Sequence, residues 1–165
     1  MKYKRGKGYC DETGIAIPKD TQKHNTERKA NVCELNSKDG TIRHEMGHYL
    51  DRKNGWISLH DPAFQDAINS FKISPEQIKK VSPGGEYFYN SPMSDTFAAL
   101  TSSRHHGWFD HGKRYWNKNA ANTPTEIFAN LTNAFSAKDK TYWKLMQKEF
   151  PALTKAYEDI ITRLS

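Results

Sequence analysis

Residues 44–48 read HEMGH, and the sequence around them predicts a helix. On a helix, residues four apart lie on one face, so the imidazoles of His44 and His48 can reach a single metal ion. Glu45 lies beside them and can polarise a metal-bound water. In a chain of 165 residues with seven histidines, such a pattern arises by chance roughly 2% of the time. Its surroundings therefore decide how it is interpreted.

The flanking residues favour a helix over this segment. Asp39 and Thr41 are good N-cap residues, and Lys53-Asn54-Gly55 is a typical helix stop. Four apolar residues recur at helical spacing and predict the face that packs on a core: Ile42, Met46, Tyr49 and Leu50. Gly47 costs a helix about 1 kcal/mol relative to alanine, which indicates a close approach by another segment.

Asp51 lies three residues after His48, on the same side of the predicted helix. It could accept the free N–H of a metal-bound imidazole and so fix its tautomer. A solvated carboxylate is an equally good interpretation. The sequence alone leaves both open.

The pattern HExxH is typical of zinc metallopeptidases, in which a catalytic zinc has a third protein ligand and an open position for water. Metzincins place a glycine and a histidine at the third and sixth residues after the second histidine. Here those positions hold Asp51 and Asn54, which excludes that class. A carboxylate from a later segment could complete the set, with His60 as an outside candidate. The main candidates are Asp61, Asp66, Glu76, Glu86 and Glu126.

Glu126 is the strongest of these candidates because it lies at the start of a predicted helix. Thr123 is expected to be the N-cap and Pro124 the first helical residue, with Ile127 and Leu131 as packing positions. The same spacing also forms a capping box, in which the glutamate only bonds back to the cap. The local sequence does not decide between the two roles.

Two segments together resemble a known family. Residues 44–51 (HEMGHYLD) and 125–130 (TEIFAN) are similar to gluzincin-type metallopeptidases whose third ligand comes from an E-x-F-A-E helix. Such a pattern occurs in anthrax lethal factor-like peptidases and in the metallopeptidase-like domains of phage minor head (head morphogenesis) proteins. Residues 110–116 (DHGKRYW) resemble the G-H-x-x-x-Y-W stretch of the phage group. The resemblance spans about residues 38–135 and its motifs are short.

The resemblance implies Zn²⁺ held by His44, His48 and Glu126, with Glu45 as general base. The chain departs from the family pattern at Asn130, where a second glutamate is usual. Peptide hydrolysis also needs a donor for the oxyanion that develops on the scissile carbonyl. Related peptidases place a tyrosine or a histidine opposite the metal, so the candidates here are Tyr115 and His111. A packed aromatic and a loop histidine are the alternatives for these two residues.

The length predicts one domain, residues 1–165, with an irregular lead-in over 1–28. We expect an α+β, helix-rich, zincin-like fold with a small β-sheet, because residues 30–35 alternate as an edge strand does. Residues 86–89 could be a brief strand or a loop. Helices are expected over 62–72, after Ser74, over 95–100 with Ser94 as cap, and in two C-terminal segments of which the last carries a core face.

The net charge of +6 is compatible with nucleic acid, but the basic residues form no recognition motif, so nucleic-acid binding is not expected. No apolar run is long enough to cross a membrane, and the N-terminus does not read as a signal peptide. Two isolated cysteines favour a reducing compartment. We therefore expect a cytoplasmic, bacterial or phage-encoded protein, with virion association or secretion as alternatives.

The function expected from this sequence is zinc-dependent hydrolysis of peptide bonds, with a protein or peptide as substrate. The alternative is a non-catalytic structural or interaction module of a phage or mobile-element particle that retains a zinc site. A structural zinc site usually has four protein ligands and often thiolates, which would require Cys10 and Cys33 to join the histidines.

Overall fold

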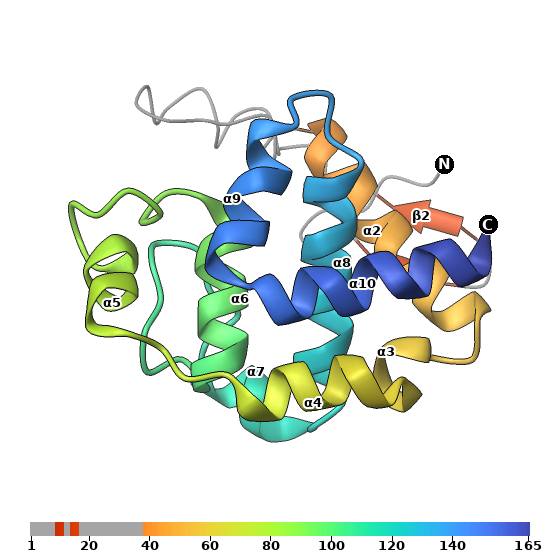
Figure 1. Ribbon diagram of the computed structural model, residues 1–165, viewed down its shortest axis with the longest axis horizontal. Helices are drawn as coiled ribbons and strands as arrows, with labels where there is room; N and C mark the ends of the chain where they lie inside the picture. Colours follow the sequence, from red (N-terminus) through yellow and green to blue (C-terminus); the bar gives the residue numbers. More distant parts are fainter. Residues whose placement is uncertain (1–8, 12–13, 17–37) are drawn as a thin grey trace.

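The computed structural model describes residues 9–11, 14–16 and 38–165. From residue 38 onward the chain is a succession of helices, with the longer loops at residues 82–90 and 102–112 (Figure 1). No helix in the described ranges combines the length and apolar character needed to cross a membrane. The helices are α2 (Lys38–Lys53), α3 (Ile57–His60), α4 (Pro62–Ser70), α5 (Pro75–Val81), α6 (Ser91–Thr101), α7 (Lys113–Lys118), α8 (Asn122–Phe135), α9 (Thr141–Glu149) and α10 (Pro151–Leu164).

Helix α8 lies at the centre of the molecule, with α2 and α6 against it and α10 crossing in front (Figure 1). Its residues from Pro124 to Ala134 are all buried. Most of these side chains are apolar or small, and the buried polar ones include Glu126 and Asn130. Ile127, Phe128 and Leu131 have no exposed surface. The elements that carry the metal-site candidates are therefore fixed relative to one another by packing on α8.

The expected α+β fold with a small sheet is wrong. The buried hydrophobic residues of the described core lie on helices or in the loops between them. Strand pairing in the described residues is limited to an antiparallel hairpin of β1 (Tyr9–Asp11) and β2 (Gly14–Ala16), three residues each, beside α2. Two such short strands form no layer on which helices could pack. The predicted edge strand at 30–35 lies outside the described residues, and residues 86–89 form turns.

Helix α2 buries a different face from the one predicted by its apolar residues. Gly40, Glu45, Gly47 and Asp51 are buried, whereas Met46 is 41% exposed. The prediction that Met46 packs in the core is wrong, because α8 approaches α2 along its small and polar residues. The stop after Lys53 is confirmed. The two predicted caps instead lie within the helix, at Asp39 and Thr41.

Most expected helices are present, and their caps are confirmed in part. Asp61 caps α4, which begins at Pro62, and Ser74 and Gln77 form the predicted capping box of α5. The cap of α6 is Asn90 rather than Ser94, since this helix begins at Ser91. The Asn90 side chain accepts the backbone N–H of Met93, and Pro92 lies in the first turn, which together favour this start.

Gly47 marks the closest approach between α2 and α8, which confirms the prediction made for this residue. A Cβ at this position would lie 2.6 Å from the Cα of Ala129 and 2.9 Å from the Cβ of Thr132. The obstacle at Ala129 is backbone, so it cannot be relieved by a rotamer change. The absence of a side chain at Gly47 therefore lets two helices that carry polar groups lie in direct contact.

Replacing Gly47 by alanine is expected to destabilise the protein by about 2 kcal/mol. The helix gains about 1 kcal/mol of intrinsic preference from the same change, but the added methyl group forces α2 and α8 apart. Urea unfolding of the Gly47→Ala variant measures the difference. The neighbouring, exposed change Met46→Ala is the control and should alter stability by no more than about 0.5 kcal/mol. A Gly47→Ala variant as stable as the wild type would contradict this packing.

Candidate metal centre

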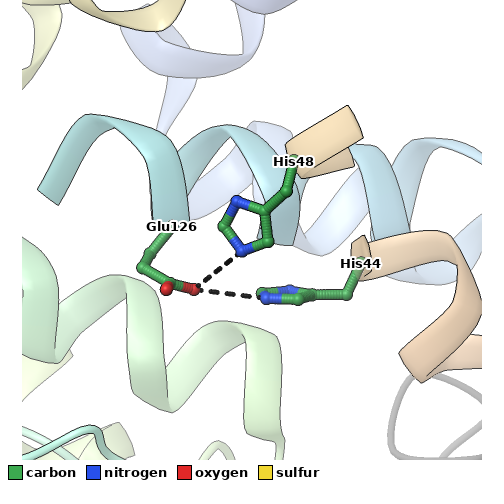
Figure 2. A group of neighbouring side chains, drawn as sticks. All are labelled: His44, His48 and Glu126. Carbon is green, nitrogen blue, oxygen red and sulfur yellow. Dashed lines mark ion pairs between the residues drawn. The ribbon is translucent and has the colours of Figure 1, made fainter. Parts of the chain in front are cut away.

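Three side chains from two helices converge on one point (Figure 2). His44 and His48 project from α2, and Glu126 projects from α8. The Nε2 atoms of His44 and His48 lie 3.2 and 3.4 Å from the same carboxylate oxygen, Oε2 of Glu126. The structure thus brings together the three residues that the sequence proposed as ligands.

The packing of α2 on α8 places these groups. His44 and Gly47 are three residues apart, and His44 and His48 four apart, so all three lie on neighbouring positions of one helix face. The contact at Gly47 brings this face against α8. Glu126 precedes Ala129, the residue touched at Gly47, by about one turn of α8. Close helix contact therefore fixes the separation between imidazoles and carboxylate.

Oε2 of Glu126 is buried and accepts no hydrogen bond from any described residue. Its neighbours are the two imidazoles, with which it forms ion pairs, so a cation bound between the three groups would take over the role of these contacts. Zn²⁺ binds imidazole nitrogen and carboxylate oxygen at about 2.0–2.2 Å in a tetrahedral arrangement, which separates two ligand atoms by about 3.3 Å. The separations of 3.2 and 3.4 Å between the imidazole Nε2 atoms and Oε2 match that spacing. The three residues therefore fit a zinc ion.

The capping-box alternative for Glu126 does not describe its surroundings. Helix α8 begins at Asn122, so Thr123 lies inside the helix rather than at its cap. The prediction of Thr123 as cap and Pro124 as first residue is therefore wrong by two positions. The Glu126 carboxylate is directed at the histidines of α2, and its side chain is only 6% exposed. The Glu126 carboxylate can therefore act as a metal ligand, because it does not cap the helix.

Opposite charges stabilise one another at this site. Burial alone would lower the pKa of His44, but the adjacent Glu126 carboxylate raises it to about 9. Burial alone would raise the pKa of Glu126, and the two imidazoles hold it well below its usual range. Without metal, His44 thus carries a proton near neutral pH, which a bound cation would displace.

Glu45 follows His44 on α2 and is 6% exposed. Burial raises the pKa of its carboxyl group, while the charges of His44 and His48 act in the opposite direction. The influence of both imidazoles on this pKa places Glu45 in the same electrostatic environment. A carboxylate with a raised pKa accepts a proton more readily at neutral pH, which suits a general base.

Tyr115 and His111, the two candidates for oxyanion donors, lie on the other side of Glu126. The Tyr115 hydroxyl donates to Oε1 of Glu126 at 2.5 Å. The Nε2 atom of His111 is 3.9 Å from the same oxygen, and its ring stacks on Tyr115 with centroids 4.5 Å apart. Burial and the charge of Glu126 raise the pKa of Tyr115, so the phenol stays protonated. Both residues adjoin the site.

Two residues that the sequence did not single out as site residues extend this arrangement. Asp95 of α6 is buried; its Oδ1 lies 2.8 Å from Nδ1 of His111. The other oxygen of Asp95 accepts from the amide of Asn130 at 3.1 Å. Asp95, His111 and Glu126 form a second group of possible ligand atoms that shares Glu126 with the first. Asn130 lies four residues after Glu126, on the same face of α8. Its position was the one feature of the sequence that could have indicated a further polar group beside Glu126.

Asp51 is not the solvated carboxylate that was considered as one of its two roles. It has no exposed surface, so it is not a solvated carboxylate. Its two oxygens accept from the backbone N–H and the hydroxyl of Ser58 at 2.8 and 2.7 Å. Asp51 therefore joins the end of α2 to α3, and its role in orienting an imidazole stays a prediction.

The remaining candidate ligands lie outside this cluster. Asp61 pairs with Arg163 and caps α4, and Glu76 is exposed beside Lys80. Neither belongs to a group of ligand atoms that could hold a metal within the described ranges. Cys33 lies outside the described residues.

Comparison of the chain with protein-family models, with curated proteins and with solved structures finds no match. The geometry of the site and the short motifs of the sequence are therefore the basis for any functional proposal.

Proposed function

We propose that this chain is a zinc-dependent metallopeptidase that hydrolyses peptide bonds. One observation carries the proposal: two imidazole Nε2 atoms and one buried carboxylate oxygen converge at the spacing of tetrahedral zinc ligands. A buried glutamate, Glu45, directly follows the first of these histidines. Three ligands with an adjacent carboxylate are typical of catalytic zinc sites, since structural sites usually have four protein ligands.

The residues of the site have separate tasks in this proposal. His44, His48 and Glu126 would hold Zn²⁺, which when bound polarises water and lowers its pKa toward neutrality. Glu45 takes the proton of the attacking water and delivers it to the leaving amine. Burial, which raises the pKa of Glu45, supports this exchange because it makes the carboxylate a stronger proton acceptor.

His111 is the proposed donor to the oxygen of the scissile carbonyl. Asp95 lies beside its Nδ1 and can accept the N–H there, which orients the ring and leaves Nε2 to face the site. The opposite nitrogen, Nε2, is on the side of Glu126. A donor held in place before the reaction stabilises the developing negative charge without reorganisation.

Comparing zinc-loaded wild type with zinc-loaded Glu45→Gln on unfolded protein substrates and a mixed peptide library tests the proposal. Loss of hydrolysis with zinc retained supports an enzyme. Equal behaviour of both proteins would favour a zinc site that serves folding or assembly.

A further inference from the structure

We propose that Tyr115 is a positioning residue for Glu126: its hydroxyl holds one carboxylate oxygen so that the other is presented to zinc. This inference rests on the proposed zinc site and gives Tyr115 a different role from the oxyanion donor expected from the sequence. It concerns metal affinity, which can be measured without any substrate.

The two oxygens of Glu126 have different surroundings. Oε1 accepts the Tyr115 hydroxyl, whereas Oε2 has no such hydrogen bond among the described residues and forms ion pairs with both imidazoles. A free carboxylate can rotate and offer either oxygen, or both at once. A hydrogen bond to Oε1 removes that freedom and leaves Oε2 as the single metal-facing atom. Glu126 is thus set up as a one-oxygen ligand before any metal arrives.

Tyr115 is itself held at several points. Its ring stacks on His111, which Asp95 binds, and Asp95 in turn accepts from Asn130 of α8. Its backbone carbonyl accepts the side-chain amide of Asn122, at the start of α8, at 2.8 Å. The segment that carries Tyr115 is therefore anchored at both ends to the helix that carries Glu126. Such an arrangement fixes the hydroxyl relative to the carboxylate.

An oxyanion role would conflict with this geometry. The phenol has one proton, and it is donated to Oε1. Donating it to a substrate oxygen would leave Oε1 without that donor in a side chain that is only 6% exposed. Leaving a buried acceptor unsatisfied costs about 1–3 kcal/mol, and more for a charged group. The structure therefore favours a permanent bond between Tyr115 and Glu126.

The test is the zinc dissociation constant of Tyr115→Phe, measured by competition with a chromophoric chelator. Outer hydrogen-bond partners of metal ligands typically change affinity about 10–100-fold when removed, and we expect a loss of that size. The matched control is Tyr157→Phe. This change removes a buried hydroxyl that donates at 3.0 Å to Thr132 of α8, the helix that also carries Glu126. Its zinc affinity should equal that of the wild type. Urea unfolding of the metal-free proteins shows that both variants are folded.

The visible spectrum of the Co²⁺-loaded proteins gives a second readout, which reports ligand geometry directly. We expect Tyr115→Phe to shift this spectrum, because Glu126 can then bind through either or both oxygens, and Tyr157→Phe to leave it unchanged. Unchanged zinc affinity and spectrum in Tyr115→Phe, with slower hydrolysis, would overturn the inference and restore the oxyanion role. Failure of the wild type itself to bind zinc would instead overturn the proposed function.

Discussion

Glu45→Gln is expected to keep its zinc and to lose peptide hydrolysis by about 10²–10⁴-fold, the usual contribution of a general base. Glutamine has nearly the same shape as glutamate but cannot accept a proton from water. Glu45 is not one of the three converging groups, so the ligand set stays complete. Its replacement by a neutral group also removes a buried charge, which should leave the fold intact.

Zinc content by elemental analysis and initial rates on a peptide substrate together measure this effect. Glu76→Gln is the matched control: it makes the same chemical change on an exposed side chain that pairs only with Lys80 in the described structure. The control should hydrolyse as the wild type does. A Glu45→Gln variant with wild-type turnover would rule out Glu45 as the base, and one without zinc would place Glu45 among the ligands.

Glu126→Ala is expected to weaken zinc binding by at least about 100-fold, more than the loss of an outer hydrogen-bond partner. The change removes one of the three proposed ligands and the negative charge that would balance the cation. Titration of the metal-free protein with zinc in the presence of a competing chelator measures the affinity. Hydrolysis should fall in parallel at limiting zinc.

Glu149→Ala is the control for the loss of a buried glutamate. Glu149 accepts from Lys80, Tyr87 and Gln77, a network that joins α5 and the following loop to α9 and does not include the histidines of α2. This variant should be less stable but bind zinc as the wild type does. Unchanged zinc affinity in Glu126→Ala would show that the third ligand lies elsewhere in the chain.

The parts of the site that could be predicted from the sequence depend on helical geometry alone. Residues four apart meet on any helix, so the pairing of His44 with His48 needed no knowledge of the fold. Gly47 could be interpreted in the same way. Glycine inside a helix costs free energy, so its presence there indicates that another segment comes too close for a side chain. Glu126 required the family resemblance as well, because its local sequence fitted a capping box equally well.

The parts that could not be predicted depend on packing between distant segments. The helix face of α2 that would be buried was misjudged because apolar spacing pointed to Met46, whereas α8 packs on glycines and charged groups. The contact of Asp95 with His111 joins α6 to a loop and has no local pattern. The sheet was expected from a segment outside the described residues, and the described core is helical without it.

The most direct test of the zinc site is anomalous diffraction from crystals of the zinc-loaded protein, with data collected on both sides of the zinc absorption edge. We predict one strong zinc peak about 2.0–2.2 Å from the Nε2 atoms of His44 and His48 and from a carboxylate oxygen of Glu126. A zinc peak bound by other residues, or none at these three side chains, would contradict the account.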